Sequence, residues 1–187
     1  MKKKLTVLCD ADDTIEDMLP YWIDELNQKH DLSVQKADIK AWDMRKAFPT
    51  LTVDQIYEPV RQKAFWNRIT PVRNSALFLK EIMEDGHDLY IVTASHYSML
   101  DVKIAKILDM FPFLSWKQII VAYDKQLVHG DVIIDDGIHN LIGNPCPHKF
   151  LFHQPHNANI DETQFGIQRV RSWDEIYGKI LVASYKK

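Results

Sequence analysis

The chain of 187 residues is long enough for one domain with its own hydrophobic core, or for a core with a small insertion. Apolar residues make up 46% and charged residues 26%, as in an ordinary globular protein, and a net charge of −3 argues against a nucleic-acid scaffold, which is usually basic. No stretch approaches the roughly 18 apolar residues of a membrane span. The two cysteines, Cys9 and Cys146, form neither a disulfide framework nor a zinc site by their spacing. We therefore expect a cytoplasmic, reduced protein that binds neither a membrane nor a nucleic-acid polymer.

An apolar run over residues 5–9 predicts a buried strand, and it stops abruptly at a group of acids that includes Asp10, Asp12 and Asp13. Ligands of open α/β sheets bind outside the carboxyl ends of such strands. Because three adjacent acids repel one another, the stretch favours a site that binds a cation. The alternative interpretation is a solvated acidic turn.

Residues 16 to about 70 predict helices but no convincing strand. The first helix has Met18, Leu19, Trp22, Ile23 and Leu26 at helical spacing and ends near residues 30–31. A capping box at residues 52–55 opens another helix, which carries Ile56, Val60 and Ala64. The segment is too long for an ordinary crossover between strands. We therefore expect a helical cap at residues 16–70, inserted into a core formed by residues 1–15 and 71–187.

Strands and helices alternate after Pro71. Asn74 is predicted to cap a helix with Leu77, Phe78, Ile82 and Met83 inward, and Gly86 to end it. Apolar runs predict further strands at residues 89–92, 119–122, 132–134 and 150–152. A helix with Leu100, Ile104, Ile107 and Leu108 follows the first of these, and a capping box at residues 172–175 opens the last helix. This alternation predicts an α/β fold with a doubly wound parallel sheet.

Several predicted strand ends have polar residues with catalytic potential, namely Thr93, Lys125, Asp135 and Asp136. Taken singly, Thr93 fits a helix cap, Lys125 a solvated lysine and the acidic pair a turn. The carboxyl ends of parallel strands share one edge, so these side chains are predicted to converge with Asp10 and Asp12.

This constellation resembles the haloacid dehalogenase superfamily of phosphohydrolases. Asp10-Ala11-Asp12-Asp13-Thr14 matches its Asp-x-Asp-x-Thr/Val motif, and Ile91-Val92-Thr93, Lys125 and the stretch 130–136 match the other three. The resemblance implies a Rossmann-like fold with a cap after the first strand. The presence of Asp12 argues against a dehalogenase, because a leaving halide needs no proton.

Within that superfamily the chain resembles the 5′(3′)-deoxyribonucleotidase family over nearly its whole length. Asp124-Lys125, the stretch 150–157 and the stretch 171–176 support this resemblance. Two positions depart from the family pattern. Ala94-Ser95-His96 stands where Ser-Pro usually follows the threonine, and His153 replaces an aspartate. Both lie near the expected substrate end, so they bear on substrate identity rather than on the chemistry.

The resemblance implies a phosphatase that forms an aspartyl-phosphate on Asp10, with Asp12 as general acid and base. Thr93 and Lys125 would stabilise charge on the transferred oxygens. Mg²⁺ would cancel the repulsion between a phosphate dianion and the carboxylates. The implied ligands of Mg²⁺ are Asp10, the backbone carbonyl of Asp12, Asp135 and, through water, Asp136. The implied substrate is a small phosphomonoester, with a deoxynucleoside monophosphate favoured.

Several other residues are candidate contacts for a substrate or a metal. Aromatic side chains in the cap can stack on a base, and Trp42 and Phe48 are the preferred candidates, whereas Trp22 and Trp66 are expected to pack the cap. Ala94, Ser95 and His96 directly follow Thr93 and are expected to face the substrate. His148, His153 and His156 do not have the spacing of a helical pair, so a metal role is not favoured for them.

Three alternatives stay open at this point. The first is a phosphatase for another phosphorylated metabolite, because the cap sets specificity. It also shares acids, a threonine and a lysine at strand ends with phosphoacceptor signalling domains, although those have the acceptor on the third strand. A non-catalytic binding module is disfavoured because every catalytic position is filled. The base, the sugar, the position of the phosphate and the oligomeric state do not follow from the sequence.

Overall fold

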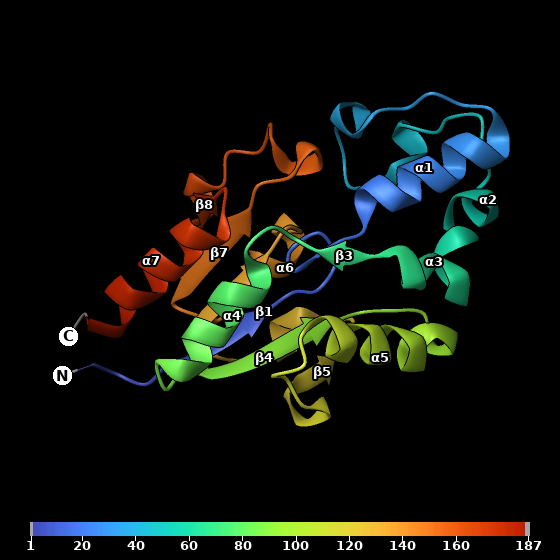
Figure 1. Cartoon of the computed structure of the whole chain (residues 1–187). Coiled ribbons are helices and arrows are strands. Elements are labelled where there is room, and N and C mark those ends of the chain that lie inside the picture. Colours follow the sequence, from blue (N-terminus) through green and yellow to red (C-terminus); the bar gives the residue numbers. More distant parts are fainter. Residues whose placement is uncertain (1, 186–187) are drawn as a thin grey trace.

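A computed structural model describes residues 2–185 and contains a six-stranded, entirely parallel sheet (Figure 1). The strands lie in the order β5-β4-β1-β6-β7-β8, so the first strand of the chain is central. Their bounds are Thr6–Cys9 for β1, Asp88–Thr93 for β4, Ile119–Val121 for β5, Val132–Asp135 for β6, His148–Phe152 for β7 and Gln168–Val170 for β8. The predicted strands are confirmed to within two residues at each end, and β8 was not predicted.

Each central strand contributes to two apolar cores, one on each face of the sheet. Val7 and Cys9 pack into the core that also contains residues of α4 (Ser75–Glu84), α5 (Leu100–Met110) and α7 (Trp173–Tyr185). Leu8 points to the opposite face and packs with Leu141 of α6 (Ile138–Leu141). Burial on both faces explains why the strands read as continuous apolar runs. The predicted doubly wound α/β fold is therefore confirmed.

A second group of helices lies beyond one end of the sheet (Figure 1). It comprises α1 (Leu19–His30), α2 (Val53–Tyr57) and α3 (Lys63–Arg68), which share an apolar core of their own. The chain enters and leaves this group through β2 (Glu16–Asp17) and β3 (Thr70–Pro71), which pair antiparallel. We propose that residues 16–70 form the cap and that β2 and β3 are its two connections to the core.

The helix expected after the capping box at residue 52 is interrupted. Thr52 and Gln55 form the box, but α2 ends at Tyr57 and a 3₁₀ turn over Pro59–Arg61 precedes α3. Proline has no N–H to continue the helical hydrogen bonds, so the helix cannot run through Pro59. The prediction that one helix carries Ile56, Val60 and Ala64 is therefore wrong, and Ala64 lies in α3.

In α4 the predicted inward face is wrong at one position. Leu77 is 53% exposed, whereas Ser75, Leu79 and Ile82 are buried at helical spacing. Asn74 precedes the helix with a left-handed backbone (φ 65°), and its side chain does not cap the helix. The last predicted capping residue is confirmed, since the Ser172 hydroxyl accepts a hydrogen bond from the Glu175 N–H at the start of α7. Among residues 2–185, no helix is both long enough and apolar enough to cross a membrane.

Candidate active site

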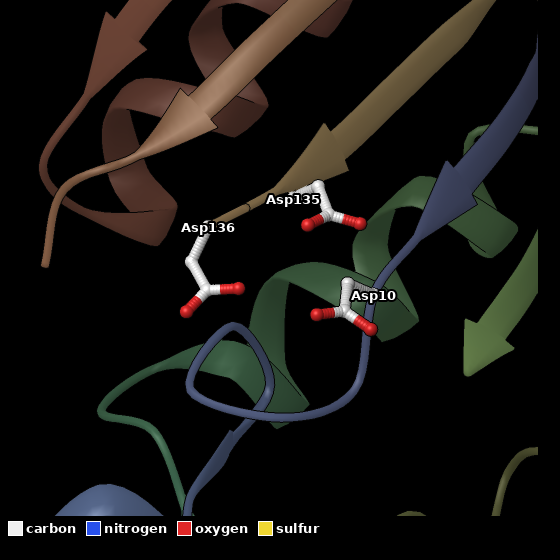
Figure 2. Close-up of side chains that lie close together, drawn as sticks. All are labelled: Asp10, Asp135 and Asp136. Atoms are coloured by element: carbon white, nitrogen blue, oxygen red, sulfur yellow. The ribbon is translucent and has the colours of Figure 1, made fainter. Parts of the chain in front are cut away.

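Three buried carboxylates meet where two adjacent strands end. Asp10 follows β1, whereas Asp135 ends β6 and Asp136 follows it, and Figure 2 shows all three side chains pointing into one space. One carboxylate oxygen from each lies within 4.8 Å of the others. Burial raises the pKa of Asp10 and Asp136, and the neighbouring carboxylate of Asp135 raises both further. Several buried carboxylates at one site are costly unless a cation compensates their negative charge.

Lys125 supplies one positive charge. It begins the 3₁₀ turn Lys125–Leu127, and its side chain is only 5% exposed. Its Nζ donates hydrogen bonds to Oδ1 of Asp10 and, at 2.7 Å, to Oδ2 of Asp135. Burial alone would lower the pKa of Lys125, but the two carboxylates outweigh it and raise the pKa above its ordinary value. One ammonium among three carboxylates still leaves the site negative.

The second oxygen of Asp135 is held by the turn that follows β6. Its Oδ1 accepts hydrogen bonds from the Gly137 N–H at 2.8 Å and from Nδ2 of Asn140 at 2.9 Å. A Cβ atom on Gly137 would lie 3.1 Å from that Oδ1 and 2.8 Å from Cε1 of His139. A side chain at Gly137 would therefore crowd both groups, and the turn sets the orientation of the Asp135 carboxylate.

Two further polar groups face this site with unused hydrogen-bonding capacity. Thr93, at the end of β4, is fully buried, and its Oγ1 has no partner among the described residues. Oδ1 of Asp12 is also buried without a partner among the described residues, whereas Oδ2 of Asp12 accepts a hydrogen bond from Lys103. An unpaired buried polar atom is costly, and at a site edge it points to a ligand that completes it.

The loop after β1 is tied down by side chains from distant parts of the chain. Its carbonyls accept hydrogen bonds at 2.7–3.0 Å from Gln154 to Asp13, from Trp173 to Thr14 and from Ser75 to Ile15. Asp13 has a left-handed backbone (φ 53°), and its Oδ1 accepts the N–H groups of Met18 and Leu19 at the start of α1. Asp13 is therefore buried and structural, and the stretches around residues 154 and 173 position the catalytic loop.

Asp12 and Ala94 line two of the cavities that adjoin the site. The carboxylate cavity, of about 270 Å³, is also lined by Asp10, Trp42, Tyr123, Lys125, His139 and Asn140. The cap cavity, of about 260 Å³, is lined mainly by cap residues and by the segment after β4, namely Met18, Trp22, Tyr57, Val60, Arg61, Trp66, Ser95, His96 and Lys103. Charged and polar side chains dominate the lining of the first cavity, whereas the second is lined largely by aromatic and aliphatic side chains.

Comparison with known proteins supports this interpretation of the site. The family model described as "5' nucleotidase, deoxy (Pyrimidine), cytosolic type C protein" matches residues 3–186. The chain belongs to this family. Among the relatives of this nucleotidase-family chain, a 5′(3′)-deoxyribonucleotidase from Bacillus subtilis (strain 168) is 32% identical over 183 residues, which cover 97% of this chain and all of that protein. One from Clostridium acetobutylicum is 31% identical, with 98% and 97% covered.

Solved structures agree on the fold. A haloacid dehalogenase family hydrolase from Deinococcus radiodurans R1, with bound phosphate and sodium, aligns with a TM-score of 0.68 at 13% identity and covers 98% of this chain and 97% of its own. A haloacid dehalogenase-like protein from Streptococcus pneumoniae aligns at 0.66 and 18%, with 94% and 98% covered. The resemblance to the haloacid dehalogenase superfamily is confirmed, and this member of the nucleotidase family is a phosphohydrolase.

Most of the predicted site residues lie together in this nucleotidase-family chain. Asp10, Asp12, Thr93, Lys125, Asp135 and Asp136 all lie at the carboxyl edge of the sheet. Ala94, Ser95 and His96 line the cap cavity. Phe48, however, is 1% exposed and packs inside the cap core, so the prediction that it contacts substrate is wrong. The small cap needs large side chains to fill its interior, and Phe48 is one of them.

Trp42 reaches from the cap to the core. It is 53% exposed, and its ring packs edge-on against His139 at 4.6 Å and His156 at 5.1 Å between centroids. Nε2 of His156 in turn lies 3.2 Å from the carbonyl of Asp136. His153, the departure from the family pattern, contacts Arg169 instead. Trp42 therefore touches the core beside the carboxylates, at the rim of the carboxylate cavity.

The burial of two charged residues was not predicted from the sequence. Lys103 lies in α5, and Glu16 lies in β2. The available signal was weak. Lys103 stands four residues before the inward-facing Ile107, a helical position that normally holds an apolar residue. Glu16 follows Asp12 by four residues, but nothing local showed that its side chain is enclosed.

Proposed function

We propose that this chain is a Mg²⁺-dependent phosphomonoesterase that cleaves deoxynucleoside monophosphates through an aspartyl-phosphate. The observation that supports this most strongly is the position of Asp10. Its carboxylate is buried beside the Lys125 ammonium and the acids that end β6, and Asp12 follows two residues later. A nucleophile, a charge-stabilising lysine and a proton donor are thus held on neighbouring strand ends.

The residues present fit Mg²⁺. The converging donors are all oxygens, which this hard cation prefers, and Oδ1 of Asp136 has no partner among residues 2–185. The carboxylates of Asp10 and Asp135 and the backbone carbonyl of Asp12 would hold the ion, with Asp136 acting through water. When bound, Mg²⁺ supplies positive charge that offsets the repulsion of a phosphate dianion and orients the phosphoryl group.

The chain's own residues account for the steps. A carboxylate oxygen of Asp10 attacks phosphorus, the ester P–O bond breaks, and Asp12 gives a proton to the leaving oxygen. Asp12 then takes a proton from water as that water attacks the aspartyl-phosphate, which releases inorganic phosphate and restores Asp10. The free Thr93 hydroxyl and the Lys125 ammonium stabilise charge on the phosphoryl oxygens.

The substrate class rests on the relatives and on the cap cavity. Both bacterial relatives are named 5′(3′)-deoxyribonucleotidases. Trp22, Tyr57 and Trp66 line the cap cavity, which Asp12 also lines. Aromatic stacking contributes about 1–3 kcal/mol per base. Family membership and the adjacent proton donor Asp12 favour turnover over a long-lived phosphoprotein, so a signalling role is the weaker proposal.

The test is a phosphate-release screen over deoxy- and ribonucleoside monophosphates and common sugar phosphates. We expect the highest kcat/KM on a deoxynucleoside monophosphate. A clear preference for a sugar phosphate would instead support a phosphatase for another metabolite. A stable phosphoprotein without phosphate release, after incubation with a small phosphodonor, would contradict the phosphatase mechanism.

A further inference from the structure

Lys103 lies beneath the catalytic loop, although the proposed mechanism does not use it. Its side chain is 1% exposed, and it comes from α5 of the core. Its Nζ donates to Oδ2 of Asp12 and, at 3.3 Å, to the carbonyl of Ala94. The ammonium also lies 5.1 Å from the centre of the Trp66 ring in the cap. One buried cation therefore touches the proton donor, the segment after β4 and the cap.

Glu16 is the second acid beside this lysine. It is fully buried in β2, the first connection to the cap, and its Oε1 lies 3.8 Å from Nζ of Lys103. Neither of its carboxylate oxygens has a hydrogen-bond partner among the described residues. A carboxylate enclosed in this way is costly unless a charge compensates it, and Lys103 is the nearest positive charge. Glu16 and Asp12 therefore share one ammonium.

The contacts of Lys103 leave Asp12 with one oxygen held and one oxygen free. Oδ2 is held by the lysine, whereas Oδ1 is buried without a hydrogen-bond partner among the described residues, so the lysine fixes the orientation of the carboxyl. We propose that Lys103 and Glu16 are positioning residues: Lys103 orients the Asp12 carboxyl for proton transfer, and Glu16 holds Lys103 in place from the cap connection. This inference rests on the proposed function, in which Asp12 protonates the leaving oxygen.

A comparison of leaving groups tests the role of Lys103. A nucleoside monophosphate releases an alkoxide, which needs a proton, whereas a dinitrophenyl phosphate releases a stable phenolate, which does not. The ratio kcat/KM reports the first transfer to Asp10 and is the quantity to measure. We expect Lys103→Met to lower kcat/KM about 100-fold for the nucleotide and less than about fivefold for the aryl ester. General acid catalysis contributes about 10²–10⁴-fold to a rate, so its loss is large enough to detect.

The matched control is Lys106→Met, which removes a partly exposed lysine from the same helix. We expect it to leave both esters within about twofold of the wild type, because exposed side chains contribute little. Lys103→Arg retains the buried charge and should recover part of the nucleotide activity that Lys103→Met loses. It also serves as the test variant if Lys103→Met does not fold, because a misplaced guanidinium should still reduce nucleotide cleavage selectively.

Glu16→Gln tests the second half of the inference. We expect a smaller loss on the nucleotide than for Lys103→Met, and little change on the aryl ester. If Glu16 acts through Lys103, the double variant should be no worse than Lys103→Met alone, because the effects of coupled residues do not add.

Two outcomes would overturn the inference. One is an equal fractional loss on both esters in the Lys103 variants, which would mean a merely structural role. The other is full additivity of the Glu16 and Lys103 effects. A wild-type protein that cleaves neither ester would instead contradict the proposed function itself, so the two failures are distinguishable.

Discussion

Lys125 donates a hydrogen bond to Oδ2 of Asp135 at 2.7 Å, and the same ammonium contacts Asp10 on the neighbouring strand. This bridge places the lysine between the proposed nucleophile and a proposed Mg²⁺ ligand. It also limits how far apart the two strand ends can move. Because the lysine contributes only one positive charge, the chemistry and the stability of the site are expected to depend on a bound cation.

Replacement of the nucleophile is the most direct test of the covalent mechanism. We expect Asp10→Asn to abolish hydrolysis of a generic aryl phosphate, a loss of at least about 10⁴-fold, because an amide cannot form the phosphoryl intermediate. Asp109→Asn, which changes an exposed acid of α5, is the matched control and should remain active. Full activity of Asp10→Asn would exclude the aspartyl-phosphate.

Removal of the metal should silence the enzyme and lower its stability. We expect exhaustive EDTA treatment to abolish phosphate release and excess Mg²⁺ to restore it. Ligand at 100 times its Kd stabilises a protein by about 2.7 kcal/mol, so Mg²⁺ should raise Tm by about 5–10 °C for a chain of this size. Thermal unfolding with and without Mg²⁺ measures this directly. Activity that survives chelation would rule out the metal assignment.

Stability without metal should fall as pH rises. Burial raises the pKa of Asp13, Glu16 and Asp136 above the ordinary carboxyl value. Above about pH 4 the folded chain therefore binds more protons than the unfolded chain, and the free energy of unfolding decreases with pH until the raised pKa values are passed. The pKa of exposed acids such as Asp24 is lowered by hydrogen bonds from Arg68, so such acids do not contribute to this fall in stability.

The measurement is Tm in EDTA as the pH is raised above about pH 4, where ordinary carboxyls are already ionised. We expect Tm to fall across this range and the slope to shrink in Glu16→Gln, which has one fewer buried acid. A slope that is the same in Glu16→Gln and in the wild type would show that Glu16 is not protonated more readily in the folded chain.

Trp42 is expected to matter more for nucleotides than for simple esters. Trp42→Ala should raise KM for a nucleotide by about tenfold, since loss of stacking is worth about 1–3 kcal/mol, and change an aryl phosphate much less. Trp116→Ala is the matched control, because Trp116 is exposed and lies in the turn just before β5. Equal losses on both substrates would indicate that Trp42 only docks the cap against His139 and His156.

The turn after β6 should control metal affinity. Gly137→Ala introduces a Cβ that crowds Oδ1 of Asp135, so we expect Mg²⁺ affinity to fall by about 10–100-fold, as for other changes that disturb the support of metal ligands. Gly178→Ala in α7 is the control, since its Cβ meets nothing within 4 Å. The activity of each variant as a function of Mg²⁺ concentration gives the comparison. Unchanged affinity in Gly137→Ala would show that the turn tolerates the crowding.

Local patterns predicted the sheet and its catalytic edge well. Apolar runs that end in Asp10, Thr93 and Asp135 determine both the strands and the chemistry at their ends, and parallel topology then brings those ends together. The cap was predicted less well, because its short helices depend on packing rather than on periodicity. Phe48 is the clearest case: an aromatic residue in a polar stretch gives no local sign of whether it faces a ligand or a core.

Short apolar runs and their order are enough to predict the fold and the residues at the strand ends, and the motifs at those ends carry the resemblance to the family. The bridge from Lys125 to Asp10 and Asp135, and the enclosure of Lys103 and Glu16 beside Asp12, become visible only in the folded chain. The physical reason is distance along the chain. Lys103 is 91 residues from Asp12, and the burial that gives such a charge pair its strength arises only when α5, the catalytic loop and the cap pack together.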